Sequence, residues 1–215
     1  MKLIDLSVRE FVYKVESASP APGGGSVSAM AATLGTGLLR MMGHLTIPKK
    51  KFKGLDDAVQ SEYITIHESF KKDQKQLLDL IDRDTDAFNN IMDAFKLPKT
   101  TDKEKKYRKK TIEQATIKAI EIPEKIADIA LSALEKVDFI RKYGNKNAIS
   151  DVGVSALMLY AGLEGACLNI KINLSGLSDS AQKQTYKDKV QSLLNEGMDI
   201  KNGCMRAIHD VLDEG

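Results

Sequence analysis

The sequence is poor in the residues that build β-sheets and disulfide frameworks. Its 215 residues include no tryptophan, 6% aromatic residues, five prolines and two cysteines. Because strands are enriched in aromatic side chains, this scarcity favours an all-helical protein. The net charge of only +2 gives no general electrostatic attraction to nucleic acid or to an anionic membrane. With 42% hydrophobic and 29% charged residues, the composition is typical of a globular chain, and we expect one domain over residues 1–215.

The two cysteines favour a cytoplasmic protein, and the N-terminal sequence indicates neither a secretory signal nor a membrane span. Cys167 and Cys204 each lie inside a helical pattern without a partner at metal-ligand spacing, so we expect buried, reduced thiols. The opening "MKLIDLSVREF" carries charges that a secretory signal excludes. Residues 17–39 are uncharged, but prolines and glycines interrupt them early, and the apolar remainder is too short to span a bilayer. We therefore expect no membrane association.

Capping patterns and apolar periodicity predict a bundle of long helices. Ser7 with Glu10 and Thr101 with Glu104 are capping boxes, each opening a helix. The second of these should reach about residue 143 and be kinked or restarted at Pro123. Ser26 and Ser150 are natural N-caps for two further helices. The further expected helices cover residues 26–45, 55–95 (one long helix or, as we favour, a bent pair), 151–173, and a last one ending near 212.

Three consecutive glycines, Gly23, Gly24 and Gly25, stand directly before the helix expected from Ser26. Ordering glycine costs more backbone entropy than ordering any other residue, so a fixed triplet needs a reason. One reason is a tight crossing of two chain segments. The other is a backbone cradle whose N–H groups point at a ligand.

Standard catalytic and metal-binding patterns are mostly missing. The three histidines, His44, His67 and His209, lie on separate predicted helices without paired spacing, and no His/Cys cluster suggests a metal site. The glycine triplet is not followed by the lysine and hydroxyl of a P-loop. Two lysine clusters, "PKKKFK" and "DKEKKYRKK", lack the interleaved aromatic residues that stack on bases, so we expect no nucleic-acid partner.

Polar residues embedded in apolar surroundings are the remaining candidates. They are grouped at the start of the most apolar helix (Asn147, Ser150, Asp151), near its end (Glu164, Asn169, Lys171, Asn173) and in "DRDTDAFNN" (Asp82, Asp86). Asp82 and Asp86 share one helix face, and burial there would raise their pKa values and make them acid–base candidates. For each residue, capping or surface solvation is the alternative.

Four segments in order resemble the cyclodeaminase/cyclohydrolase family, the C-terminal half of formiminotransferase-cyclodeaminase and its free-standing bacterial relatives. They are "SPAPGGGSVSAMAATLG", "DTDAFNNIMDAFKLPKTTDKEK", "GNKNAISDVGVSALML" and "EGACLNIKINLSGLSD". The resemblance implies an all-helical fold, a homodimer or higher homo-oligomer, and a tetrahydrofolate substrate with no permanently bound cofactor. Two reactions occur in the family: closure of 5-formimino-tetrahydrofolate to the 5,10-methenyl form with loss of ammonia, and hydrolysis of the methenyl form to 10-formyl-tetrahydrofolate.

The chemistry of the two folate reactions suggests roles for residues within these motifs. A carboxylate stabilises the cationic methenyl bridge and transfers protons, and we expect Asp151, or else Asp86, to do this. Asn147, Ser150 and Asn173 would hold the pterin. The backbone of Gly23, Gly24 and Gly25, with Ser26, would receive the substrate at a helix N-terminus. The glutamate tail would need cations, from residues 49–53 or from Lys99.

Two questions stay open at this point. The sequence does not separate cyclodeaminase from cyclohydrolase. The alternative to an enzyme is a non-catalytic helical interaction module in which the small residues of the second helix form a dimerisation face. In either case the apolar helices predict at least a dimer, with the folate site at the seam as one possibility.

Overall fold

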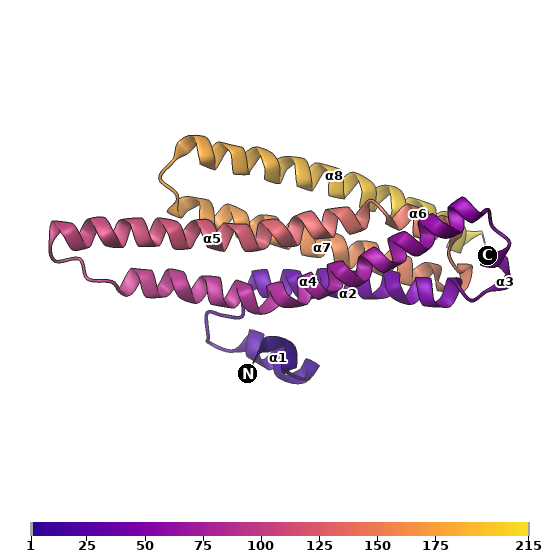
Figure 1. Cartoon of the computed structure of the whole chain (residues 1–215), viewed down its shortest axis with the longest axis horizontal. Helices are drawn as coiled ribbons and strands as arrows, with labels where there is room; N and C mark the ends of the chain where they lie inside the picture. The colour runs from indigo at the N-terminus through magenta and orange to yellow at the C-terminus, as the bar shows by residue number, and fades with distance from the viewer. Residues whose placement is uncertain (1, 215) are drawn as a thin grey trace.

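Five long helices run side by side in the computed structural model, which describes residues 2–214 (Figure 1). The terminal residues of the expected domain, 1 and 215, lie outside this range. The helices are η1 (Leu3–Asp5), α1 (Val8–Glu16), α2 (Gly24–Thr46), α3 (Lys50–Lys53), α4 (Asp57–Lys96), α5 (Asp102–Leu134), α6 (Val137–Tyr143), η2 (Lys146–Ala148), α7 (Ile149–Asn173), η3 (Leu174–Gly176) and α8 (Ser180–Asp213). No strand occurs among the described residues, and the predicted all-α bundle is confirmed.

The core of the bundle is the contact between α2 and α7, which run in opposite directions (Figure 1). A Cβ added to Gly35 would lie 2.7 Å from Leu159 Cγ, and one added to Gly162 would lie 2.8 Å from Ala32 Cβ. Larger side chains at these positions would push the helices apart. The small residues of the two helices therefore allow their backbones to approach closely.

The apolar helix α7 is packed by its neighbours. The helical segment Lys146–Gly176 is long and apolar enough to cross a membrane by length and composition, and half of its most apolar window is buried inside the bundle. Contacts with α2, α5 and α8 cover its buried face. This is the pattern of a core helix.

Two expectations about long helices are wrong. Residues 57–96 form one uninterrupted helix, α4, instead of a bent pair. Its buried residues Tyr63, Phe70 and Leu77 recur every seven positions, so a single continuous stripe faces the core. The helix opened by Thr101 ends at Leu134 instead of continuing to residue 143, and Pro123 lies inside it without restarting it.

The two helices predicted from capping boxes begin where expected, whereas the two predicted from single serines begin earlier. Both capping boxes, Ser7 with Glu10 and Thr101 with Glu104, are present. Ser26 is not an N-cap, because α2 already begins at Gly24. Ser150 likewise lies inside α7, whose N-cap is Ala148.

Helix α1 stands apart from the bundle (Figure 1). Within α1 only Phe11 is buried, while Val8 is 84% exposed and Val12 is also exposed. Its attachment to the bundle comes partly from the preceding turn, where the Leu3 N–H donates to Asp82 Oδ1 on α4 at 2.6 Å. In a single chain, one face of α1 therefore has no apolar partner.

Candidate active site

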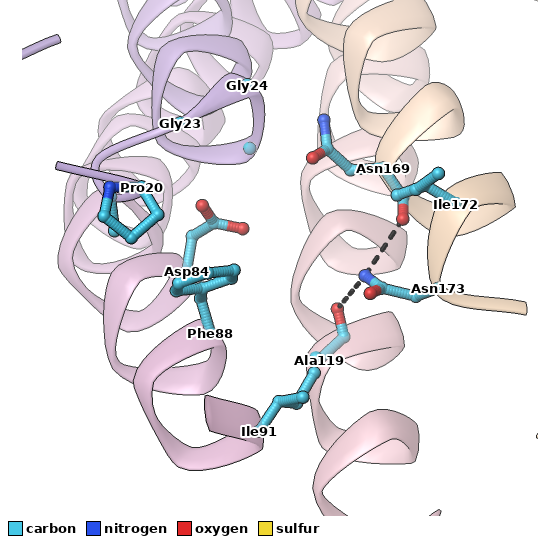
Figure 2. A pocket seen from close by; sticks show the side chains of 12 residues that line it. Pro20, Gly23, Gly24, Asp84, Phe88, Ile91, Ala119, Asn169, Ile172 and Asn173 are labelled. Carbon is cyan, nitrogen blue, oxygen red and sulfur yellow. Dashed lines mark hydrogen bonds between the residues drawn. The ribbon is translucent and has the colours of Figure 1, made fainter. Parts of the chain in front are cut away.

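A cavity of about 260 Å³ lies between the first turn of α2, the middle of α4, α5 and the last turns of α7 (Figure 2). Its lining consists of Pro20, Ala21, Gly23, Gly24, Gly25, Asp84, Phe88, Ile91, Ala119, Asn169, Ile172 and Asn173. One carboxylate and two amides stand among apolar side chains in this list. A concave site in which a few polar groups converge among apolar side chains is typical of a small-molecule pocket.

Asp84 is the carboxylate of this pocket. Its Oδ2 accepts a hydrogen bond from the Ser26 N–H at 2.9 Å and lies 3.2 Å from Ser26 Oγ. Burial raises the pKa of Asp84 above its ordinary value, while the hydrogen bonds from Ser26 pull that pKa the other way. A half-buried carboxyl group with a raised pKa, facing a cavity, is a strong acid–base candidate.

The glycine triplet allows side chains of α4 and α7 to approach the backbone of α2 closely. No glycine among the described residues has a positive φ. A Cβ on Gly25 would lie 2.0 Å from Asp84 Oδ1, and a Cβ on Gly24 would lie 3.1 Å from Asn169 Nδ2. Asp84 thus rests directly on the backbone of the first turn of α2, where only glycine leaves room for it.

Two asparagines of α7 face Asp84 from the opposite wall of the pocket (Figure 2). Asn169 Nδ2 donates to the Gly165 carbonyl at 2.8 Å. Asn173 Nδ2 donates to the Asn169 carbonyl at 3.0 Å and to the Ala119 carbonyl at 3.4 Å. These bonds fix both amide groups, so that each brings an oxygen acceptor to the pocket wall.

The Ala119 carbonyl on α5 is free to accept this hydrogen bond because of a proline. In an α-helix the carbonyl of Ala119 would accept from the N–H of residue 123, and Pro123 has none. The side chain of Asn173 supplies the missing donor. Pro123 thereby connects the backbone of α5 to a side chain of the pocket.

Comparison with known proteins identifies the family. The sequence model described as "Formiminotransferase-cyclodeaminase" matches residues 7–192. The chain belongs to the formiminotransferase-cyclodeaminase family.

Relatives in this family differ in length. Rat formimidoyltransferase-cyclodeaminase (Rattus norvegicus) is 34% identical over 194 residues, which are 90% of this chain but 35% of the relative. The methenyltetrahydrofolate cyclohydrolase of Methylorubrum extorquens is 33% identical over 190 residues, 88% of this chain and 89% of the relative. The crystal structure of formiminotetrahydrofolate cyclodeaminase from Thermotoga maritima superposes with a TM-score of 0.77 at 25% identity, covering 97% and 96% of the two chains. The chain thus spans about a third of the bifunctional relatives and nearly all of the cyclohydrolase.

Some of the residues predicted from the sequence do meet in the pocket. Gly23, Gly24, Gly25 and Asn173 all line it. Ser26 lies beneath the wall, fully buried, where its Oγ donates to the Ile81 carbonyl at 2.8 Å. It therefore positions Asp84 instead of contacting a ligand.

Asp151 does not share this pocket, and the expectation that it lies beside the glycine triplet is wrong for a single chain. It lies 18 residues before Asn169 on α7, which is about 27 Å along the helix axis. Because α7 runs antiparallel to α2, the end of α7 meets the glycines and its start lies at the far end of the bundle (Figure 1). Asn147 lines a different cavity at that far end, and Ser150 is exposed there.

Asp86 and Lys99 are also outside the pocket. Asp86 is exposed in a shallow groove between α4 and α5, and Lys99 is exposed in the connection between the same two helices. The residue missed was Asp84, although it stands between Asp82 and Asp86. Helical spacing places Asp84 on the buried face of α4, because it lies three residues after the buried Ile81 and three before the buried Ala87.

The remaining chemically active side chains do not form a site of their own. His44 and His67 come from separate helices but lie edge to face, with ring centroids 4.8 Å apart, and burial lowers the pKa of His67. Cys167 and Cys204 are free and buried, as expected, and burial raises the pKa of each thiol to about 11. Within residues 2–214 no group of three His, Cys, Asp or Glu side chains is arranged to hold a metal ion.

Proposed function

We propose that this protein forms or opens the N5–C–N10 bridge of tetrahydrofolate, with Asp84 as its acid–base group. The relatives are named as cyclodeaminases that act on formiminotetrahydrofolate and as a methenyltetrahydrofolate cyclohydrolase. The single observation that carries the proposal is the Asp84 carboxyl, fixed by Ser26 in a pocket formed with Asn169 and Asn173. The reduced folate is a substrate in this scheme, not a resident cofactor.

Hydrolysis of the methenyl form uses the ionised carboxylate. Its negative charge stabilises the cationic N5–C–N10 bridge, and it accepts a proton as water adds to the bridging carbon. Asp84 returns this proton to N5 as the bond between N5 and the tetrahedral carbon breaks, the hydroxyl group on that carbon releases its own proton to solvent, and 10-formyl-tetrahydrofolate remains. The raised pKa of Asp84 makes it a stronger base than an exposed aspartate.

Cyclodeamination uses the same group in the other protonation state. N10 adds to the formimino carbon while its proton passes to the formimino nitrogen, and the tetrahedral intermediate then loses the amino group formed in this way. Protonated Asp84 donates to that departing nitrogen, so that ammonia leaves and the methenyl bridge forms. Both reactions need one carboxyl group close to one carbon, which is what the pocket offers.

The test compares three aspartates. Asp84→Asn should lower kcat for both substrates at least about 100-fold, because it removes the acid–base group. Asp86→Asn and Asp151→Asn are matched controls outside the pocket and should keep kcat within about twofold of the wild type. Absorbance of the methenyl chromophore measures both reactions. Full activity of Asp84→Asn would refute the assignment, and the ratio of kcat/KM for the two substrates decides which reaction dominates.

The non-catalytic alternative makes a different prediction. A helical interaction module would bind no reduced folate, and calorimetric titration with methenyl-tetrahydrofolate would show no heat. The pocket argues against it, since a purely structural interface does not need a carboxyl group desolvated beside an open cavity.

The second part of the proposal is a homodimer through α2 and α7. Each helix carries exposed large apolar side chains at helical spacing: Val27, Leu34, Met41 and Leu45 on α2, and Val154, Leu157, Leu168 and Ile172 on α7. Two stripes of this length on adjacent helices are typical of an association surface. Ile172, 72% exposed, also lines the Asp84 pocket, so a second subunit on this face would extend the pocket wall.

A further inference from the structure

A second and larger cavity, of about 560 Å³, lies between α3 and the segment that joins α6 to η2. It includes Thr46 at the end of α2, whereas the Asp84 pocket lies at the start of that helix. Its lining consists of Thr46, Lys49, Lys50, Lys51, Phe52, Tyr143, Gly144, Asn145, Lys146 and Asn147. Four of these ten residues are lysines and none is acidic. This cavity is called the lysine cavity below.

The ammonium groups of the lysine cavity have no carboxylate partners in the described part of the chain. None of the four lysines forms an ion pair within residues 2–214, and Lys146 Nζ reaches only the Arg141 carbonyl, at 3.4 Å. The nearby carboxylate of Asp138 is already paired with Arg141 at 2.6 Å. Like charges gathered around one hollow repel each other, and a bound anion would remove that repulsion.

The acidic residues of the neighbouring segments lie outside the lining. Asp56 and Asp57 open α4 just after α3, and both are exposed. Lys53 and Lys142, also exposed, add two more cations to the segments that frame the cavity. The framing segments therefore remain predominantly cationic.

The floor of the lysine cavity belongs to the rigid core. Phe52 is 3% exposed and packs edge to face against Tyr63, with ring centroids 5.1 Å apart. The Asn145 N–H donates to Thr46 Oγ1 at 2.9 Å, which joins two segments 99 residues apart. The cavity is thus held open by tertiary contacts instead of by a single loop.

A glycine is required where these two segments meet. A Cβ on Gly144 would lie 2.5 Å from the Ile140 carbonyl oxygen and 3.0 Å from Met42 Sδ. The backbone of residues 144–147 is therefore set against α2 with no room for a larger side chain.

We propose that the lysine cavity binds a multiply charged small anion, a phosphate ester or an oligocarboxylate, as a site separate from the Asp84 pocket. The ammonium groups of Lys49, Lys50, Lys51 and Lys146 would surround the charged groups, and the half-buried Tyr143 offers aromatic surface to the rest of the ligand. The volume is within the usual range of about 300–1,000 Å³ for small-molecule sites. Lysines act as point charges without a fixed fork, so the site should recognise charge more than shape.

The experiment is calorimetric titration of the whole protein with tripolyphosphate, with adenosine triphosphate and with tri-γ-glutamate, at low and at physiological salt. The double variant Lys50→Gln/Lys146→Gln should weaken binding at least about tenfold. Lys183→Gln/Lys187→Gln is the matched control, because it removes the same charge from another cleft with three lysines, at the start of α8. All four lysines are exposed or half-buried on the surface, so both variants should fold, which circular dichroism verifies.

Each outcome decides the proposal. The proposal is supported if one-to-one binding at physiological salt is lost in the first variant and kept in the control. The probe that binds most tightly then indicates whether the natural anion is a phosphate or a carboxylate. Equal weakening in both variants would mean unspecific attraction and would overturn it. Absence of binding by all three probes at physiological salt would overturn it as well.

Discussion

At the scale of single residues, the pocket depends on how one carboxyl group is held. Asp84 is buried enough to have a raised pKa, yet Ser26 offers it two hydrogen bonds that oppose the shift. The balance between desolvation and hydrogen bonding sets the protonation state of the group. This balance can be altered without touching the carboxyl itself.

Ser26→Ala should move the pH profile of hydrolysis. Hydrolysis needs ionised Asp84, so kcat/KM falls as the pH drops through its pKa, which lies above the ordinary aspartate value. Removing the Ser26 hydroxyl removes one interaction that lowers this pKa, and the acidic limb should shift to higher pH. The profile of kcat/KM against pH measures the shift. An unchanged limb together with a uniformly lower rate would mean that Ser26 is only structural.

Gly25→Ala should disable the pocket while Gly23→Ala leaves it intact. The new Cβ at position 25 would lie 2.0 Å from Asp84 Oδ1 and displace the carboxyl, and a misplacement of about 1 Å costs about 100-fold in rate. At position 23 the nearest atom is the Pro20 carbonyl oxygen, 3.6 Å away, an ordinary contact. Steady-state kinetics of the two variants measure the difference, and equal activities would contradict the close packing described above.

At the scale of helices, α5 and α7 are connected by a hydrogen bond that replaces a missing bond within α5. Pro123 leaves the Ala119 carbonyl without its helical donor, and Asn173 of α7 fills the place. An interior proline normally costs a helix about 3 kcal/mol. Here the free Ala119 carbonyl orients the side chain of Asn173 in the pocket. The proline is therefore unfavourable for α5 alone but contributes to the site.

Pro123→Ala should raise stability and lower activity. Alanine restores the N–H that competes with Asn173 for the Ala119 carbonyl, and the loss of one hydrogen bond of about 0.5–1.5 kcal/mol predicts a decrease in kcat/KM of about 2- to 12-fold. Urea unfolding should show a higher midpoint.

Asn173→Ala tests the coupling between the two positions. If Pro123 acts through Asn173, the double variant should lose no more activity than Asn173→Ala alone. Additive losses in kcat/KM would contradict this connection.

At the scale of the whole molecule, one face of the bundle remains uncovered. The stripes of α2 and α7 and the exposed face of α1 are apolar in a single chain. Burial of such surface contributes roughly 25 cal/mol per Å², which opposes the entropy cost of association, so a second copy would bind to this face in preference to a polar one. A two-fold axis would place the same stripes opposite each other.

Leu34→Glu should convert a dimer into a monomer. The side chain, 52% exposed in the single chain, lies in the middle of the α2 stripe, and a buried unpaired charge there would be costly. Met92→Glu on α4, 40% exposed, is the matched control and should leave the dimer intact. Sedimentation velocity measures both variants. A wild-type protein that sediments as a fully active monomer would contradict the proposed dimer.

The sequence by itself determined the all-helical class and the family. Capping boxes at Ser7 and Thr101 act within one turn, and apolar periodicity acts within one helix, so both are readable from a single sequence. The resemblance likewise depends on local segments. The glycine triplet and Asn173 were identified as site residues because their motifs are unusual along the chain.

Only the tertiary structure decided which carboxyl group belongs with them. Asp84 and Ser26 are 58 residues apart in the sequence, and no local pattern states that they touch. The antiparallel course of α2 and α7 brings Asn169 to the glycines and carries Asp151 to the other end. The physical reason is that helix formation is governed by near neighbours, whereas a pocket is made by side chains that meet only when whole helices pack.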